Sequence, residues 1–127
     1  MRTLILAALT FFSAAAFAAP PSVSVRDLRE LCERGEATDQ TSVRNAARAT
    51  CIAYLDAVVA TVNQIAVLAS ADGRARPDVG FCVRPDATEE DLVRLFLASA
   101  RRNPQHANVA AASIASAAFA EAWPCRR

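Results

Sequence analysis

The chain has 127 residues, of which 54% are hydrophobic, and its 14 basic residues (all arginine) nearly balance 13 acidic ones. This length is enough for one small domain with a single core. A near-neutral chain without a basic patch gives no reason to expect nucleic acid or an anionic membrane as a partner. After the N-terminal region, we expect no second apolar stretch that is long and uninterrupted enough to cross a membrane.

The N-terminus has the pattern of a signal peptide. A positive charge precedes an apolar run that is too short and too rich in alanine for a stable membrane anchor. Ala16 and Ala18 fit the two positions that a signal peptidase reads, so we predict that residues 1–18 are removed and that residues 19–127 form the mature domain. An uncleaved anchor is the alternative, but the two prolines that follow end any helix and favour release. We therefore expect an exported, periplasmic protein.

Helical periodicity predicts two helices in the first half of the mature chain. The first begins near Val25, with Ser24 as its N-cap, and stops at Gly35. After a polar linker at 36–40, one apolar stripe continues from about Thr41 for about eight turns and is wider than a half-buried face. We predict that this second helix is central and is covered on more than one side.

A loop and a third helix follow. Glycine and proline mark residues 72–80 as a loop, after which Phe81-Cys82-Val83 returns to the core. Thr88 and Asp91 have the spacing of a capping box and predict the start of the third helix. The side chains expected on its buried face are Leu92, Leu95, Phe96 and Ser99.

The remaining chain predicts a fourth helix. Asn103 and Pro104 have the pattern of an N-cap followed by proline at the first helical position. This helix is rich in alanine, and its larger side chains are Val109, Ile114 and Phe119. No strand-like alternation of useful length occurs. The predicted fold class is all-α, a small disulfide-stapled bundle of about four helices.

Four cysteines, Cys32, Cys51, Cys82 and Cys125, fall in the mature chain. An even number in a small exported protein predicts two structural disulfides. The wide spacings contain no Cys-x-x-Cys motif, and the chain has one histidine, so a redox motif or a zinc site is a poor fit. Three connectivities are open from the sequence.

The positions of the cysteines favour Cys32–Cys51 together with Cys82–Cys125. The first pair lies on the apolar stripes of neighbouring helices, and the second pair lies at helix margins, where no register forbids a bond. In a strict antiparallel hairpin, however, Cys51 lies about 15 Å into its helix and Cys32 only about 5 Å from the turn. The linker must climb, or the helices must cross steeply, for the first pair to meet.

Catalytic chemistry has little support in the sequence. His106 is the only imidazole, and we interpret it as a surface residue in the first turn of a helix. Glu89, Glu90 and Asp91 are adjacent, so they do not face one site, and capping of the helix dipole explains them. There is no glycine-rich phosphate loop and no nucleophile elbow. We expect no enzyme activity, no metal and no cofactor.

The arginines provide candidates for binding. Arg44 and Arg48 on the second helix, and Arg101-Arg102 at the end of the third, are interpreted as solvated surface. The loop after the second helix differs, because a stiffened loop with two cations and two carboxylates forms a candidate partner-binding edge. An ordinary surface connection is the alternative. The candidate residues are Asp72, Arg74, Arg76 and Asp78.

Several short motifs follow one another in a recognisable order. A cysteine late in the first helix precedes Cys51-Ile52-Ala53-Tyr54-Leu55, then Phe81-Cys82-Val83, and finally Trp123-Pro124-Cys125. In order, spacing and exported context the chain resembles the Tai-type immunity proteins of type VI secretion systems. Members of that family typically have Cys-x-x-Tyr at the start of a long helix, Phe-Cys-Val-Pro after a loop, and an aromatic-Pro-Cys terminus. The resemblance covers essentially the whole mature chain.

The resemblance implies a small helical periplasmic protein with two disulfides that blocks a peptidoglycan amidase delivered by a sibling cell. A protruding loop can plug the active-site groove of the enzyme, which makes residues 72–78 the expected contact. Such proteins are often dimeric, so a homodimer is a further expectation. Asp56 stands near where members commonly have glycine, and Arg84 separates Val83 from the next proline. The alternative function is a general periplasmic binding or envelope-stress module without a cognate toxin.

Overall fold

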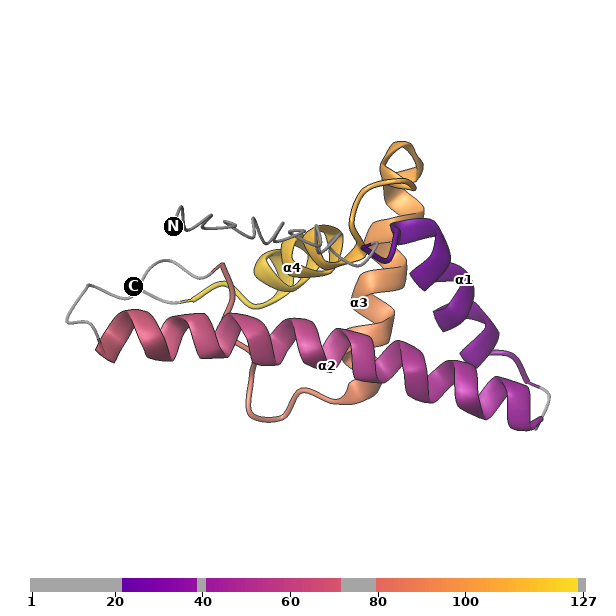
Figure 1. Ribbon diagram of the computed structural model, residues 1–127, viewed down its shortest axis with the longest axis horizontal. Helices are drawn as coiled ribbons and strands as arrows, with labels where there is room; N and C mark the ends of the chain where they lie inside the picture. The colour runs from indigo at the N-terminus through magenta and orange to yellow at the C-terminus, as the bar shows by residue number, and fades with distance from the viewer. Residues whose placement is uncertain (1–21, 39–40, 72–79, 126–127) are drawn as a thin grey trace, which may run out of the picture.

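One long helix runs along the molecule, and the other three helices lie on one side of it (Figure 1). The computed structural model describes residues 22–38, 41–71 and 80–125, and the predicted signal peptide at 1–18 lies outside them. The elements are α1 (Val25–Gly35), α2 (Ser42–Ala71), α3 (Glu89–Arg102), a 3₁₀ turn η1 (Pro104–His106) and α4 (Ala111–Ala122). The described ranges contain no strand beyond one isolated bridge. The prediction of a small all-α bundle is confirmed.

The backbone amides in the first turn of α1 find hydrogen-bond acceptors in two places, the side chain of the N-cap and the chain before α4. Ser24 is the N-cap, as predicted, and its Oγ accepts a hydrogen bond from the amide of Asp27 at 3.2 Å. The amides of Val25 and Arg26 donate to the carbonyl oxygens of Val109 and Ala107, both at 2.9 Å. The first turn of a helix normally leaves such amides without partners. The chain before α4 therefore provides acceptors for the start of α1.

These bonds explain why the predicted start of the fourth helix is wrong. The side chain of Asn103 does not cap η1, and its Nδ2 donates instead to the carbonyl oxygen of Ser99 at 2.8 Å, which closes α3. The carbonyl groups of Ala107 and Val109 bond to α1, so they are not available to a helix that continues from η1. α4 therefore begins at Ala111, and Val109, predicted as a larger side chain of this helix, is 41% exposed.

α1 and α2 approach each other closely and in opposite directions. The predicted Cys32–Cys51 disulfide is formed, with Cα atoms 5.1 Å apart and both residues 1% exposed. A Cβ atom on Gly35 would lie 2.7 Å from the Cα atom of Arg48. The two contacts are three residues apart along each helix, so the helices are antiparallel here. Gly35 does not have a positive φ; its role is close packing and not a left-handed stop.

This register resolves the difficulty that the sequence raised. α2 begins at Ser42 and Gly35, at the end of α1, packs against Arg48, so the first turns of α2 project past the end of α1. The Nε atom of Arg44 donates to the carbonyl oxygen of Gly35 at 3.3 Å, which ties the end of α1 to this projecting part. The first turns of α2 therefore lie beyond the end of α1, and α1 is steeply inclined to α2 (Figure 1), so that Cys32 and Cys51 meet.

The core lies where α3 and α4 cross the middle of α2. Phe96 and Phe119 are completely buried at its centre. Phe119 makes an edge-to-face contact with Phe81 at 5.5 Å and stacks on Trp123 at 5.6 Å. Leu92, Phe96 and Ser99 are buried on α3 as predicted, whereas Leu95 is half-buried. The second predicted disulfide, Cys82–Cys125, is also formed, with Cα atoms 4.9 Å apart.

The prediction that α2 is covered on more than one side is wrong. Its buried residues are Ala47, Cys51, Leu55 and Val58. Val59 and Val62 pack against the core at partial burial, and no large side chain of α2 after Val62 does so. The partner helices α1, α3 and α4 have 11, 14 and 12 residues against the 30 of α2, so none of them can follow it along its whole length. The exposed large side chains on the uncovered part are Ile65 (50%), Val67 (61%) and Leu68 (57%).

The expectation that no second apolar stretch is long enough to cross a membrane does not hold for α2. Its 30 residues include an 18-residue window with a mean hydropathy of 1.7, which is long and apolar enough by those two measures. The core helix of a soluble protein meets the same two criteria. Here the first half of α2 is cross-linked to α1 and contributes to the core, so length and composition do not make it a membrane span.

α3 begins with the predicted capping box. The amide of Asp91 donates to the Thr88 hydroxyl at 3.3 Å, and the Asp91 carboxylate accepts from the amide of Thr88 at 3.1 Å. Arg94 donates to the same carboxylate at 2.6 Å. The bond from Arg94 and the bond from the Thr88 amide hold the pKa of Asp91 below its ordinary value of 3.8.

Replacing Gly35 with alanine is expected to lower the free energy of unfolding by about 1–3 kcal/mol, because the new Cβ meets the backbone of Arg48. In an uncrowded helix the same change raises stability by about 1 kcal/mol. Urea denaturation of the oxidised protein measures the change. Glu30→Ala on the exposed side of α1 is the control and should stay within about 0.5 kcal/mol of the wild type. A stabilised Gly35→Ala variant would contradict the close packing.

The lowered pKa of Asp91 predicts a dependence of stability on pH. A carboxyl group with a depressed folded-state pKa stabilises the fold at neutral pH, and this contribution is lost as pH falls below about 4 through the folded-state value. We expect Asp91→Asn to be less stable than the wild type at pH 6 and the difference to shrink towards pH 2. Thermal unfolding followed by circular dichroism at both pH values tests this. A difference that stays constant across the range would rule out the cap carboxylate as its source.

Candidate partner-binding surface

The described residues contain neither a free thiol nor a cluster of metal-ligating side chains. All four cysteines are in disulfides, and no group of three or more potential metal-ligating side chains occurs within residues 22–38, 41–71 and 80–125. His106 is exposed on η1, in agreement with its interpretation as a surface residue. The described residues do present charged side chains paired between helices and exposed apolar side chains, and both kinds of surface can bind another molecule.

The predicted binding residues Asp72, Arg74, Arg76 and Asp78 lie outside the described residues. The chain on both sides of this segment is described. It leaves α2 at Ala71 and returns at Gly80, whose φ of 75° lies in the left-handed region that glycine tolerates best. Both ends therefore have fixed positions, although the sequence-predicted binding residues between them are not described.

The chain that returns after residue 79 is anchored by a buried aromatic side chain, a backbone hydrogen bond and a disulfide. Phe81 is buried against Phe119, the amide of Cys82 donates to the carbonyl oxygen of Trp123 at 2.8 Å, and Cys82 is bonded to Cys125. Cys82 itself is exposed, in contrast to the buried Cys32–Cys51 pair. The Cys82–Cys125 disulfide therefore joins the segment after residue 79 to the C-terminal end of α4.

Arg48 is not the freely solvated side chain that the sequence analysis expected. Its guanidinium group lies 2.6 Å from Glu36, at the end of α1, and 2.6 Å from Glu90, in the first turn of α3. The side chain is 29% exposed. One arginine on α2 therefore joins the ends of two other helices, and its two carboxylates leave a net negative charge at this junction.

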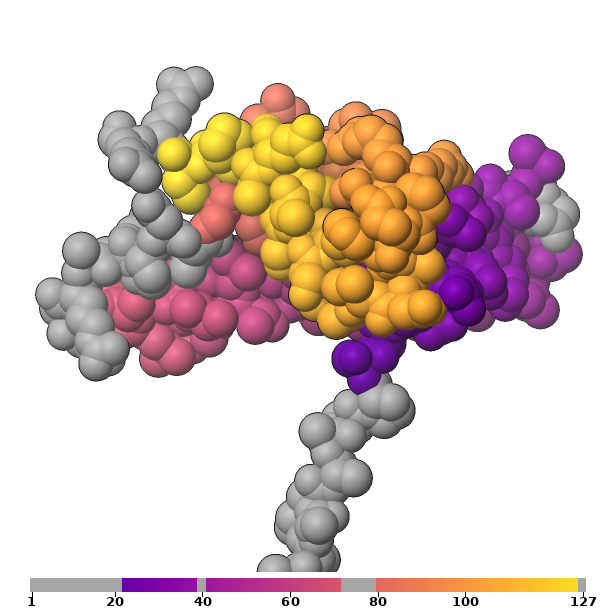
Figure 2. Space-filling model, turned by 90° about the horizontal axis from the view of Figure 1, so that it is seen from above, coloured from indigo at the N-terminus to yellow at the C-terminus, as the bar shows by residue number. Residues whose placement is uncertain are grey.

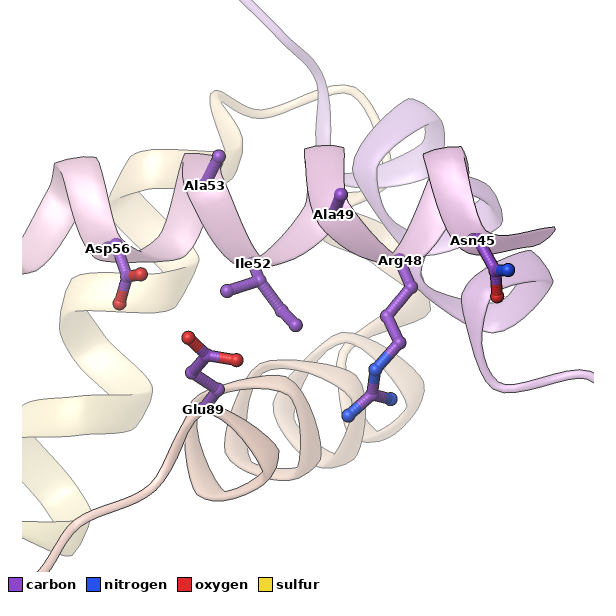
Figure 3. Close-up of a pocket in the computed structure, with 7 residues that line it drawn as sticks. All are labelled: Asn45, Arg48, Ala49, Ile52, Ala53, Asp56 and Glu89. Atoms are coloured by element: carbon purple, nitrogen blue, oxygen red, sulfur yellow. The ribbon is translucent and has the colours of Figure 1, made fainter. Parts of the chain in front are cut away.

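A shallow hollow of about 420 Å³ lies beside this junction, between α2 and the start of α3 (Figure 3). Ile52 projects towards the first turn of α3, with the carboxylates of Asp56 and Glu89 on one side of it and the guanidinium group of Arg48 on the other (Figure 3). The lining residues are Asn45, Arg48, Ala49, Ile52, Ala53, Asp56 and Glu89. Asp56, a departure from the resemblance noted above, therefore makes this face of α2 more acidic.

The two arginines at the end of α3 lie on the exposed surface, as predicted. Arg101 and Arg102 lie in the last turn, where a cation is favoured by the helix dipole. Both are about 60% exposed, and each also reaches another helix: Arg101 lies 3.2 Å from Glu33, and Arg102 lies 3.4 Å from Glu121. Exposed pairs of this kind add little stability, so they leave this end of α3 as ordinary surface.

The sequence analysis missed the uncovered half of α2 as a surface. Residues 57–71 contain no charged side chain, and Asp56 is the last charge before them. Figure 2 shows this part of α2 at one end of the molecule, with α1 and the start of α2 at the other end. The absence of charge was the available signal, but the same pattern also predicts a buried helix.

Replacing Arg48 with alanine is expected to lower the free energy of unfolding by about 1–2 kcal/mol, because two carboxylates then face each other without a cation. The loss should be smaller at 1 M salt, where the charges are screened over about 3 Å. Urea denaturation at low and high salt measures both effects. Arg84→Ala is the matched control, because among the described residues Arg84 pairs with exposed Asp86 at 3.3 Å and its loss should change stability by less than about 0.5 kcal/mol. Equal losses in the two variants would refute a special role for Arg48.

Comparison with known proteins gives one match. A family model described as Rap1a immunity proteins matches residues 24–125, from the N-cap of α1 to the last cysteine. The matched range includes both disulfides. A search of curated proteins and of solved structures gives no significant match.

Proposed function

The chain belongs to the Rap1a immunity protein family, and we propose that it protects its cell by binding a secreted peptidoglycan amidase in the periplasm. The toxin would be one delivered by a type VI secretion system, as the resemblance to Tai-type proteins implies. The immunity protein would block the enzyme sterically and perform no chemistry itself. The family match over residues 24–125 is the observation that carries this proposal, because it covers the complete helical bundle.

The disulfides support the compartment. Both pairs are formed, and cysteines remain paired in oxidising compartments such as the bacterial periplasm. The signal peptide predicted at residues 1–18 would direct the chain there, with residues 19–127 as the mature protein. A family of immunity proteins implies a protein partner in the form of a toxin, and this favours the toxin inhibitor over a general periplasmic module.

The loop after α2 is our candidate for the contact with the toxin. Its predicted binding residues are Asp72, Arg74, Arg76 and Asp78. The described ends of the loop support this assignment, because a loop held by α2 on one side and by the Cys82–Cys125 disulfide on the other loses less entropy on binding than a free segment. A homodimer, which the resemblance also implies, is a second part of the proposal.

A binding experiment with secreted and periplasmic amidases of the same strain tests the proposal. The full chain is expressed with its own N-terminus, exported, and purified in the oxidised form. We expect capture of one amidase with nanomolar affinity and loss of its peptidoglycan cleavage in the complex. Mass spectrometry of the purified protein should show a chain that begins at Ala19. Capture of no amidase from an extract that contains active enzyme would refute the proposed function.

The loop is tested separately. Replacing residues 72–78 with a glycine-serine segment of equal length should weaken binding by about 30-fold or more, equal to about 2 kcal/mol. The variant Arg101→Ala, on an exposed surface of α3, is the control and should bind normally. Unchanged affinity of the loop variant would show that another surface contacts the toxin.

A further inference from the structure

The two disulfides lie in different surroundings. Cys32 and Cys51 are each 1% exposed and belong to the hydrophobic core. Cys82 is exposed and Cys125 is half-buried, and both lie outside the helices, one before α3 and the other after α4. A reducing agent opens a disulfide when its thiolate attacks one of the two sulfur atoms, so the rate depends on access to the bond. The fold therefore gives a reductant unequal access to the two bonds.

The Cys32–Cys51 bond is protected by the packing of α1 on α2. The helices are so close that a Cβ atom on Gly35 would lie 2.7 Å from the Cα atom of Arg48, three residues from the bond along each helix. A thiolate that entered this core would lose its hydration and gain no partner for its charge. It reaches the bond only when the two helices separate, and such an opening is rare for core elements.

The chain on both sides of Cys82–Cys125 is held by contacts that do not depend on the bond. The amide of Cys82 donates to the carbonyl oxygen of Trp123 at 2.8 Å. Phe81 contacts Phe119 edge to face, and Phe119 stacks on Trp123. Phe81 and Trp123 are 3% and 6% exposed, so they are part of the core. These contacts would keep the two cysteines as neighbours after the bond is opened.

We propose that the Cys82–Cys125 disulfide is a reversible redox site, which a dithiol reductant opens while the helical bundle and the Cys32–Cys51 bond stay intact. The juxtaposition of an accessible bond with an independent set of core contacts carries this inference. It does not depend on the identity of the toxin or on which surface of the protein binds it.

The exchange is balanced by the dithiol alone. One thiolate of the reductant attacks the sulfur of Cys82, the more exposed partner, and displaces Cys125 as a thiolate. The second thiol of the reductant then attacks the mixed disulfide and releases Cys82. The reductant leaves as a disulfide, and its two electrons and two protons are now on Cys82 and Cys125, as two thiols. An oxidant that accepts two electrons reverses the reaction.

The reduced form should differ from the oxidised form only near the end of α4. The bond links the segment before α3 to the chain after α4, and among the described residues it is the covalent link between these two segments. In the reduced form the hydrogen bond from the Cys82 amide to Trp123 is no longer supported by a cross-link. We expect hydrogen exchange of this amide to accelerate at least about tenfold, while the amide of Cys51, in the middle of α2, keeps its protection.

Selective reduction with dithiothreitol tests the proposal. The exported, oxidised protein is treated in native buffer, and free thiols are blocked with N-ethylmaleimide at intervals. The protein is then unfolded and fully reduced, and the remaining cysteines are labelled with iodoacetamide. An arginine lies between each cysteine and the next, so trypsin places the four cysteines on separate peptides for mass spectrometry. We expect Cys82 and Cys125 to become free at least about 100-fold faster than Cys32 and Cys51.

Three controls separate access from chemistry. In a denaturing concentration of urea the two bonds should open at rates within about threefold of each other, because the fold no longer limits access. The double variant Cys82→Ser with Cys125→Ser imitates the reduced state and should keep the far-ultraviolet circular dichroism of the wild type. Removal of dithiothreitol and addition of oxidised glutathione should restore the Cys82–Cys125 pair without new pairings.

Each result decides the question. Equal rates in native buffer, or earlier opening of Cys32–Cys51, would overturn the proposal. Loss of the helical signal when only Cys82–Cys125 is open, or in the double variant, would overturn it too, because the bond would then be a requirement of the fold. Selective opening with retained helices and correct reclosure supports it. None of these results depends on capture of an amidase, so the proposed function stands or fails separately.

Discussion

The close antiparallel contact between α1 and α2 determines where the other elements lie. The Cys32–Cys51 bond fixes the register of the two helices, and Gly35 allows their backbones to meet at Arg48. That contact places Glu36 beside Arg48, which in turn reaches Glu90 at the start of α3. The opposite end of α1 bonds to the segment before α4. A cross-link worth about 2–4 kcal/mol is a large share of a total stability of about 5–15 kcal/mol, especially where an alanine-rich helix buries little apolar area.

The two halves of α2 differ in what they contact. Its first half holds the disulfide, the buried Leu55 and the junction of charges at Arg48, so a substitution there changes the fold. Its second half carries no charge and little buried area, so a substitution there changes the surface more than the fold.

Local signals in the sequence predicted most of the fold, and tertiary contacts account for the errors. The caps at Ser24 and Thr88 were predictable because their bonds are made within a single turn. Asn103 has the same local pattern, but the carbonyl groups of Ala107 and Val109 bond to α1, which lies about 80 residues earlier in the chain, so no local rule could place the start of α4. The stripe of α2 gave the helix correctly but not its exposure, because periodicity does not show how long the covering helices are. For the candidate surface, the charge-free stretch was visible, but its pairing with Ala112 and Ser116 in a groove was not.

The order of the disulfides along the chain has a consequence for biogenesis. The cysteines are bonded in consecutive pairs, the first to the second (Cys32–Cys51) and the third to the fourth (Cys82–Cys125). A chain that enters an oxidising compartment with its N-terminus first exposes the members of each pair in turn. Simple oxidation in order of arrival then produces the native connectivity, without a step in which a wrong bond is broken and exchanged. In a chain exported in this way, the Cys32–Cys51 cross-link, on which the scaffold depends, can close before residues 82–125 emerge.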